Sequence, residues 1–429
     1  MALGGGIWTA MDKKLPGSYI NFVNAVTASS DISERGTAAY GASFDWAPSG
    51  LFLVEAEEFR TNSLKVFAHA SDSDAMKTVR ELFKHAQRVY FYNLNEGGTA
   101  ASNEYATAAK IGSRGNDIKI AITAETDSTY TVTTYLDSMV IDTQKVTSAK
   151  DLVANNYVTF KTDAKLAATA GMALTGGADG STTTASHMAF LAALESVSFN
   201  TLGCGSTDKT VVGSYISFAK RMRDDIGRKF QLVIPYIDGV NPDNEGIIQS
   251  SQASLVPWLT GAEAGCNVKS TLTNAVYDGD VLTASDIAIT QAELIQNTAR
   301  GELSFHRVES GVRILTDINS LTTYTAQKSS AFSSNQTIRV LDQIGNDVAA
   351  IFNTNYIGFA PNNETGRLAF WNSLVQYLKD LQTAGAIQGF TSGDVTVGKG
   401  NSEKDVTVEI TVTPVNAFEK LYMTVYVAQ

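Results

Sequence analysis

The chain has 429 residues, of which 44% are hydrophobic, and this is enough for several packed domains in a globular protein. Its 33 basic and 44 acidic residues give a formal charge of −11 without any run of Lys or Arg, so a nucleic-acid partner, which needs many phosphate contacts, is not expected. The two cysteines are far apart and form no CxxC pair, so neither a disulfide framework nor a metal site is expected.

The sequence pattern also indicates no secretory signal and no membrane span. The chain start lacks a basic segment followed by an apolar run, and no stretch approaches about 18 continuous apolar residues. We therefore expect no secretory signal and no membrane insertion, and the cysteine usage fits a reducing cytoplasm.

Residues 1–30 are expected to form an amino-terminal arm, because glycine and other small residues are frequent there. Within this arm a Pro-Gly turn precedes a short aromatic and β-branched run that is typical of a strand. The side chains of this expected strand include Tyr19, Ile20, Phe22 and Val23.

Residues 31–98 follow as an α/β segment. We predict a strand at 64–68, a helix at 73–88 and a second strand at 88–94. The helix prediction rests on apolar residues that share one face, namely Met76, Val79, Leu82 and Phe83.

Residues 99–180 alternate apolar and polar positions repeatedly, which predicts an inserted β-sandwich or barrel. Ile118, Ile120 and Ile122 mark one strand, and further strands are expected at 130–134 and 157–160. We expect this domain to stand apart from the core.

Residues 181–324 alternate helical and strand patterns, as in an α/β layer. We expect three helices, at 186–195, 207–225 and 286–298, and four strands, at 199–204, 230–234, 303–308 and 312–317. Thr207 and Asp208 offer capping oxygens for the second helix. Residues 325–403 contain two strongly amphipathic helices.

Residues 404–429 form a carboxy-terminal arm with two strand-like runs. The first run places Val406, Val408, Ile410 and Val412 on one face. The second run, 421–427, is apolar on one face and aromatic on the other, and its members include Tyr422, Val425 and Val427. Such strands are candidates for pairing with a sheet edge of another copy, although completing a sheet within the same subunit is an open alternative.

Several segments resemble, in order and spacing, the contractile tail sheath proteins of long-tailed phages and R-type bacteriocins. The similar segments are residues 4–9, 15–22, 33–36, 261–265, 311–315, 318–323, 356–358 and 412–422. The resemblance implies an α+β and α/β multidomain fold with a subtilisin-like, non-catalytic central domain, an inserted β-sandwich domain and an α+β carboxy-terminal domain with extended terminal arms.

The same resemblance implies a structural function. Sheath subunits form hexameric rings that stack helically around an inner tail tube, and the sleeve contracts to drive the tube through a cell envelope. The two terminal arms are exchanged between subunits and add strands to the neighbour's carboxy-terminal domain. The implied partners are further copies, the tube protein, and baseplate and tail terminator proteins, in a virion tail or phage-tail-like particle assembled in the bacterial cytoplasm.

The resemblance also implies that the carboxy-terminal domain grips the tube. We therefore take the helix around Arg367 and Lys379 as the candidate tube surface. In the alternative interpretation, Leu368, Trp371 and neighbouring leucines are ordinary core residues and the two charges are merely solvated.

Because the resemblance implies a subtilisin-like central domain, the chain could in principle carry the catalytic residues of a serine protease. The four histidines are His69, His85, His187 and His306, and no nucleophile turn accompanies the two in or near the central domain. No phosphate-binding loop is present, and adjacent carboxylates such as Asp224 and Asp225 point apart. We therefore expect no enzyme activity, catalytic residue or cofactor. The rival classes are a surface-layer or adhesin-type structural protein and a hydrolase with a degraded motif.

Overall fold

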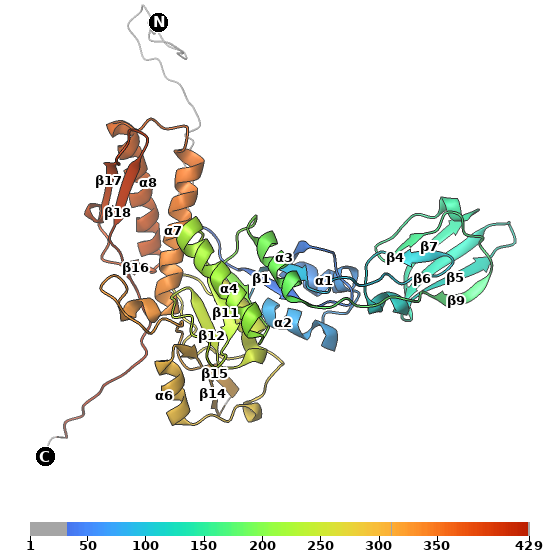
Figure 1. Ribbon diagram of the computed structural model, residues 1–429, viewed down its shortest axis with the longest axis horizontal. Helices are drawn as coiled ribbons and strands as arrows, with labels where there is room; N and C mark the ends of the chain where they lie inside the picture. The colour runs from blue at the N-terminus through green and yellow to red at the C-terminus, as the bar shows by residue number, and fades with distance from the viewer. Residues whose placement is uncertain (1–31, 310, 428–429) are drawn as a thin grey trace, which may run out of the picture. The chain divides into compact units, whose positions relative to one another are not determined.

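The computed structural model describes residues 32–309 and 311–427 (Figure 1). The described residues divide into two compact units. We call residues 33–346, 384–388 and 413–427 the body, and residues 347–383 and 389–412 the helix–hairpin unit.

A seven-stranded sheet forms the centre of the body, in the order β13-β12-β11-β10-β1-β3-β2. All neighbouring pairs are parallel except β2 (Leu51–Glu55), which is antiparallel to β3 at the edge. The parallel strands are β1 (Thr37–Ala42), β3 (Arg88–Asn93), β10 (Thr201–Gly203), β11 (Gln231–Pro235), β12 (Ile247–Ser250) and β13 (Glu302–Leu303).

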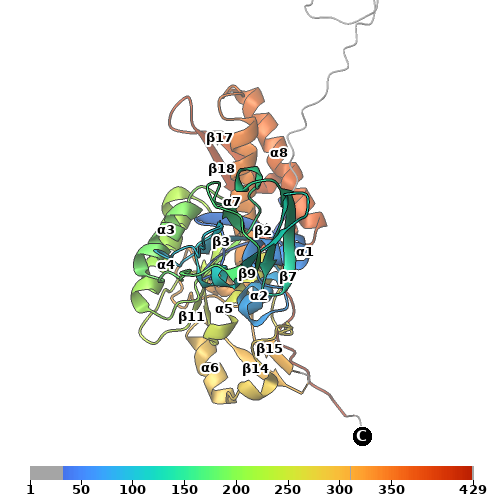
Figure 2. The same ribbon diagram turned by 90° about the vertical axis from the view of Figure 1, so that its right-hand side faces the viewer.

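Helices cover both faces of this sheet, as Figure 2 shows. On β1, Ala38 and Tyr40 join one apolar cluster whereas Ala39 joins the other, because successive strand residues point to opposite faces. The first cluster includes residues of α1 (Ala56–Phe67), α2 (Lys77–Phe83) and α5 (Val256–Gly265). The second includes residues of α3 (Thr184–Leu194) and α4 (Lys209–Arg221). Beyond the sheet lie α6 (Gln291–Ala299) and a hairpin of β14 (Phe305–Val308) and β15 (Gly311–Ile314).

Most of the elements expected for this layer are present, and Asp208 caps α4 by accepting hydrogen bonds from the backbone of Thr210 and Val211. The strand predicted at 64–68 is wrong, because these residues complete α1. Phe59, Ser63 and Phe67 are buried at helical spacing, and Ala68 ends the helix in the left-handed conformation. The helix predicted at 73–88 is also shorter than expected, since only α2 and a preceding 3₁₀ turn form.

Residues 99–180 fold as the expected β-sandwich. A four-stranded antiparallel sheet packs with a two-stranded one, and Ile118, Ile120 and Ile122 lie in the shared core. The strands are β4 (Ala106–Ala108), β5 (Ile118–Ala124), β6 (Tyr130–Leu136), β7 (Met139–Val146), β8 (Val158–Phe160) and β9 (Thr169–Ala173).

The sandwich contacts the rest of the body at the end of α1. Three of its side chains donate hydrogen bonds to carbonyl groups at the end of α1. Tyr157 binds the carbonyl of Leu64 at 2.9 Å, Lys110 that of Val66 at 2.8 Å, and Arg114 that of Ala68 at 3.0 Å. The last carbonyls of a helix lack intrahelical partners, so Lys110 and Arg114 of the sandwich provide donors for the carbonyls of Val66 and Ala68 at the end of α1.

A buried ionic cluster lies where α7 (Asn335–Asn355) begins. The guanidinium of Arg339 pairs with Glu263 of α5 and, at 2.6 Å, with Asp317, and all three side chains are almost fully buried. Asn335 adds a hydrogen bond to Asp317 at 2.8 Å. Asn335 therefore belongs to the core, although it starts a glycosylation-type Asn-x-Thr pattern.

We predict that Arg339→Met lowers the free energy of unfolding by about 3–5 kcal/mol, because it leaves two buried carboxylates without their cation. The control Arg60→Met removes an exposed pair with Glu57 and should change stability by less than about 1 kcal/mol. Urea unfolding measures both. Equal effects of the two substitutions would contradict the importance of the buried cluster.

A second prediction concerns Glu81 of α2. Its carboxylate accepts hydrogen bonds from the Asp280 backbone and the Tyr277 hydroxyl, and burial raises its pKa from 4.5 to about 7. The folded protein thus holds this proton more tightly than the unfolded chain. The resulting stabilisation is complete below pH 4.5 and is lost as the pH rises through about 7.

The free energy of unfolding should therefore fall between these pH values more steeply in the unsubstituted protein than in Glu81→Gln, which does not titrate. Urea unfolding across this range compares the two proteins. Parallel pH profiles would show that Glu81 keeps an ordinary pKa.

Candidate assembly surface

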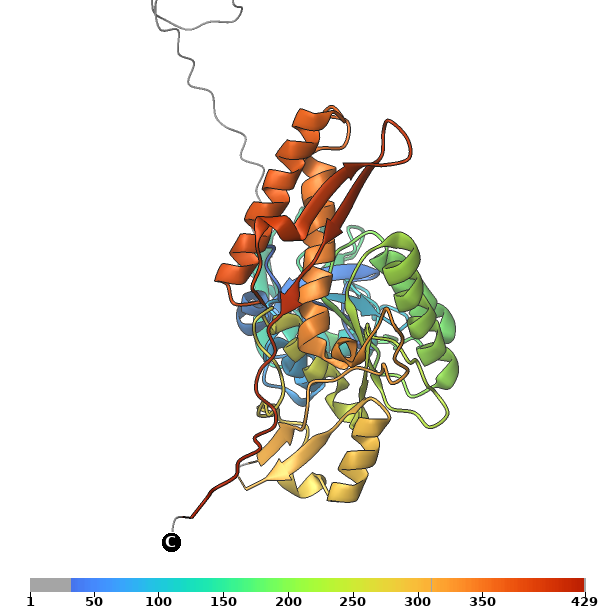
Figure 3. The same cartoon turned by 90° about the vertical axis from the view of Figure 1, so that its left-hand side faces the viewer.

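The helix–hairpin unit consists of the end of α7, α8 (Glu364–Thr383) and a β-hairpin (Figure 3). The buried face of α8 carries Phe370, Leu374, Leu378 and Leu381, which recur at helical spacing. The hydroxyl of Tyr377 donates to Asp347 of α7 at 2.8 Å. The two helices therefore provide a firm support for the hairpin.

The hairpin pairs β17 (Val395–Lys399) with β18 (Val406–Ile410) in antiparallel register. The indole N–H of Trp371 donates to the carbonyl of Val395 at 2.9 Å and fixes β17 on α8. Val395 is buried, but the other apolar hairpin residues are only half-buried. These are Val397, Val406, Val408 and Ile410, whereas Thr396, Thr407 and Glu409 alternate with them and are exposed.

The hairpin is an incomplete sheet. Among the described residues, β17 and β18 pair in a sheet only with each other. Each strand thus retains an outer edge of peptide groups, which is a template for a further strand. A two-stranded sheet is also marginally stable by itself, so added strands would both satisfy the edges and widen the apolar layer.

The chain then returns to the body, where the root of the carboxy-terminal tail is fixed. β19 (Thr413–Pro414) pairs with β16 (Ile387–Gln388). The amide oxygen of Asn416 accepts hydrogen bonds from Ser334 and Thr337, and the Ala417 N–H donates to Gln336. Glu419 accepts hydrogen bonds from the hydroxyl groups of Thr273, at 2.7 Å, and Thr316, at 3.1 Å.

Residues 418–427 contain neither helix nor strand, and we call them the tail; of these residues, only Glu419 takes part in the root contacts described above. Their large apolar side chains are all at least 70% exposed, and the tail extends away from the rest of the body (Figures 1 and 3). These side chains are Phe418, Leu421, Tyr422, Met423, Val425, Tyr426 and Val427. An exposed apolar run of this length is typical of an interaction site.

The structure thus separates the two strand-like runs that the sequence placed in one arm. The residues of the first run, Val406, Val408 and Ile410, lie in β18 and pair within their own subunit, and Val412 follows them. The strand expected at 421–427 does not form in the single chain, so Tyr422, Val425 and Val427 lie in the exposed tail. Tyr19, Ile20, Phe22 and Val23 lie outside the described residues.

The two candidate tube-contact residues differ in burial and in hydrogen bonding. The guanidinium of Arg367 is half-buried and donates to the backbone and side-chain oxygens of Asn362, at 3.3 and 3.0 Å. Lys379 is exposed on α8. Leu368 is 55% exposed, so the interpretation of all the α8 leucines as core residues is wrong for this one.

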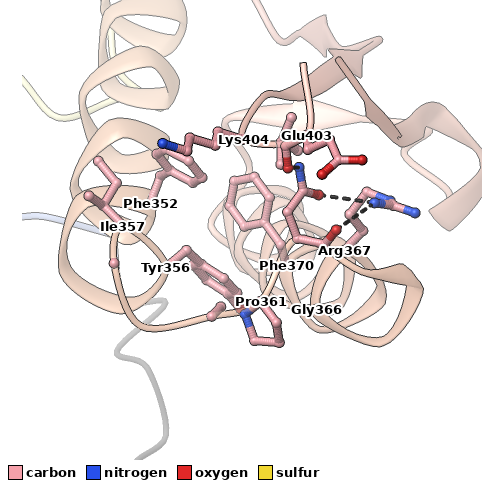
Figure 4. Close-up of a pocket in the computed structure, with 13 residues that line it drawn as sticks. Phe352, Tyr356, Ile357, Pro361, Gly366, Arg367, Phe370, Glu403 and Lys404 are labelled. Carbon is pink, nitrogen blue, oxygen red and sulfur yellow. Dashed lines mark hydrogen bonds between the residues drawn. The ribbon is translucent and has the colours of Figure 1, made fainter. Parts of the chain in front are cut away.

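An aromatic pocket of about 510 Å³, which the sequence analysis missed, opens between the two helices and the hairpin (Figure 4). The rings of Phe352, Tyr356 and Phe370 turn toward this space, and Arg367 lies at its rim. The centroids of Tyr356 and Phe370 are 4.7 Å apart. Its walls come from segments distant in sequence, so no local pattern could have indicated it.

The histidines make contacts that suit a structural role. His187 hydrogen-bonds Tyr215 at 2.9 Å, His69 lies 3.0 Å from Asp45, and His85 lies 3.1 Å from Asp278. His306 lies on β14 opposite Arg313. Burial lowers the pKa of His187 and of His306, which favours neutral rings.

No helix within the described residues has the length and apolar content that a membrane span requires. The same residues contain no group of three or more His, Cys, Asp or Glu side chains placed to hold a metal ion.

Comparison with known proteins identifies the class of this chain. Three domain profiles match consecutive segments: the phage tail sheath protein beta-sandwich domain at residues 96–179, the central domain at 180–320 and the C-terminal domain at 327–428. The phage-like element PBSX protein XkdK of Bacillus subtilis is 31% identical, with 99% of each chain covered. The chain therefore belongs to the phage tail sheath protein family, and its role is that of a structural sheath subunit.

Solved structures agree with this assignment. The sheath tail protein of Desulfitobacterium hafniense is 32% identical and superposes with a TM-score of 0.83, covering 95% of this chain and 99% of its own. The helical sheath of the anti-feeding prophage, solved in the contracted state, is only 12% identical, but it shares the fold with a TM-score of 0.58 over 96% of this chain and 99% of its own.

Proposed function

We propose that this subunit polymerises into a contractile helical sleeve by lending its tail to a neighbouring copy, whose β17–β18 hairpin receives it. The observation that carries this proposal is the coexistence of an exposed apolar tail and an incomplete hairpin sheet in one chain. The amino-terminal arm is expected to be exchanged in the same way.

The free-energy estimates favour docking of the tail on a second subunit over ordering of the tail by itself. Burying four apolar side chains stabilises by roughly 6–12 kcal/mol, whereas ordering about ten residues costs on the order of 10–20 kcal/mol of backbone entropy. A single tail therefore gains little by ordering alone. A preformed sheet edge adds backbone hydrogen bonds and a surface for the side chains, so the tail orders when an assembly supplies that edge.

The sleeve would surround an inner tube and store energy in a lattice with two stable arrangements. Contacts between bodies would change on contraction, while the exchanged strands keep the subunits connected as hinges. A baseplate would trigger the change and a terminator would end the sleeve, in a phage tail or phage-tail-like particle. The contracted state of the anti-feeding prophage sheath, which shares this fold, supports the proposal. The family assignment favours it over a surface-layer or adhesin role.

Truncation after Ala417 tests the exchange, because it removes the tail but keeps the hairpin and the contacts of Asn416. We expect a folded monomer with an unchanged circular dichroism spectrum and no sleeves in negative-stain microscopy. The control Thr424→Ser keeps the length and the apolar residues and should assemble normally. Sleeves of ordinary length from the truncated chain would refute strand exchange by the tail.

Tube attachment is assigned, as a further part of the proposal, to the helix–hairpin unit. Lys379 is the stronger of the two candidates, because Arg367 is already engaged by Asn362. We expect Lys379→Glu to weaken co-sedimentation of sleeves with purified tubes by about tenfold, which corresponds to one well-placed charge contact. Arg367→Glu serves as the comparison. Unchanged tube binding would remove the substituted residue from the contact surface.

A further inference from the structure

The aromatic pocket continues the apolar face of the hairpin. Val406, the first residue of β18, belongs both to that face and to the pocket wall. The opposite wall is formed by the rings of Phe352 and Phe370, whose centroids are 5.3 Å apart. A strand added to the outer edge of β18 would lie about 4.8 Å from it and would carry alternate side chains on the helix side, beside this pocket.

The rim of the pocket is held in place by polar contacts. Asn362 donates to the carbonyl groups of Glu403 and Asp405, both at 2.9 Å, and accepts from Arg367. The turn that leads into β18 is thereby tied to the connection between α7 and α8. The opening therefore exists before any partner arrives.

The tail has two distinct faces if it adopts a strand. One face carries the aliphatic side chains of Leu421, Met423, Val425 and Val427, and the other carries two tyrosines and Thr424. The hairpin shows the same division, with valine and isoleucine toward the helices and Thr407 and Glu409 toward solvent. Matching the two patterns turns the aliphatic face of the tail toward the helices.

We propose that the aromatic pocket is the socket for an aliphatic side chain from the 421–427 face of a second copy's tail. This inference rests on the proposed strand exchange and adds the anchor that gives the exchange its register. Without an anchor, a short alternating strand could slip by two residues along the edge and keep the same face inward. A single socket at the end of β18 gives one of these registers a more favourable binding free energy than the others.

The test uses the full-length monomer and a labelled peptide of residues 415–429, with binding measured by fluorescence anisotropy. Ala360 lines the pocket, so Ala360→Trp should fill it and weaken peptide binding by at least about tenfold. The matched control, Ala369→Trp, places the same side chain at an exposed α8 position outside the pocket and should leave binding unchanged.

Two variant peptides test the same point without any risk to folding of the protein. Replacing Met423 and Val425 by serine should abolish measurable binding, whereas replacing Tyr422 and Tyr426 by serine should weaken it by less than about threefold. Binding that is lost equally with either peptide would overturn the assignment of faces and therefore the socket.

The outcomes separate the two proposals. If the peptide binds the unsubstituted protein and both tryptophan variants alike, the tail docks elsewhere, so the socket is wrong and strand exchange stands. If the peptide binds none of the proteins, and the chain truncated after Ala417 still forms sleeves, both proposals fail.

Discussion

The apolar side chains of the tail have no cover among the described residues of the chain. Its large side chains between Phe418 and Val427 are at least 70% exposed, although the body has three well-packed clusters. The hairpin of β17 and β18 has a complementary feature, namely two open edges over a half-buried apolar face, and under the proposed exchange it covers the tail of a neighbouring copy. In the proposed assembly, the tail of one copy and the hairpin of the next each supply the partner that the other lacks among the described residues.

This arrangement needs a firm base for the tail, and the start of α7 provides it. Asn416 and Ala417 are bound by Ser334, Gln336 and Thr337, which lie beside the buried Arg339. The ionic cluster of Arg339 with Glu263 and Asp317 therefore stabilises the body and also supports the point from which the tail leaves it. If the tail is exchanged as proposed, a load on it would be transmitted to the body through these contacts.

The sequence predicted most of the fold where local patterns were strong. Alternation at Ile118 to Ile122 and capping at Asp208 were both confirmed. The helix ending at Phe67 was mistaken for a strand, because a short apolar run fits either period. Helix α5 was missed, since nearly all of its residues are buried and it has no polar face.

The candidate site could be predicted only in part. The apolar tail was evident from the residue pattern, but the sequence could not show that Val406 to Ile410 pair internally while 421–427 form no strand, because both runs have the two-residue period of a strand. The aromatic pocket depends on contacts among three separate segments, which no local pattern encodes. Amide hydrogen exchange, compared between the monomer and the assembled sleeve, tests the account most directly. We predict that residues 418–427 exchange as fast as an unstructured peptide in the monomer and become strongly protected in the sleeve, while the amides that pair β17 with β18 are protected in both. Protection of the tail in the monomer, or rapid exchange in the sleeve, would contradict the account.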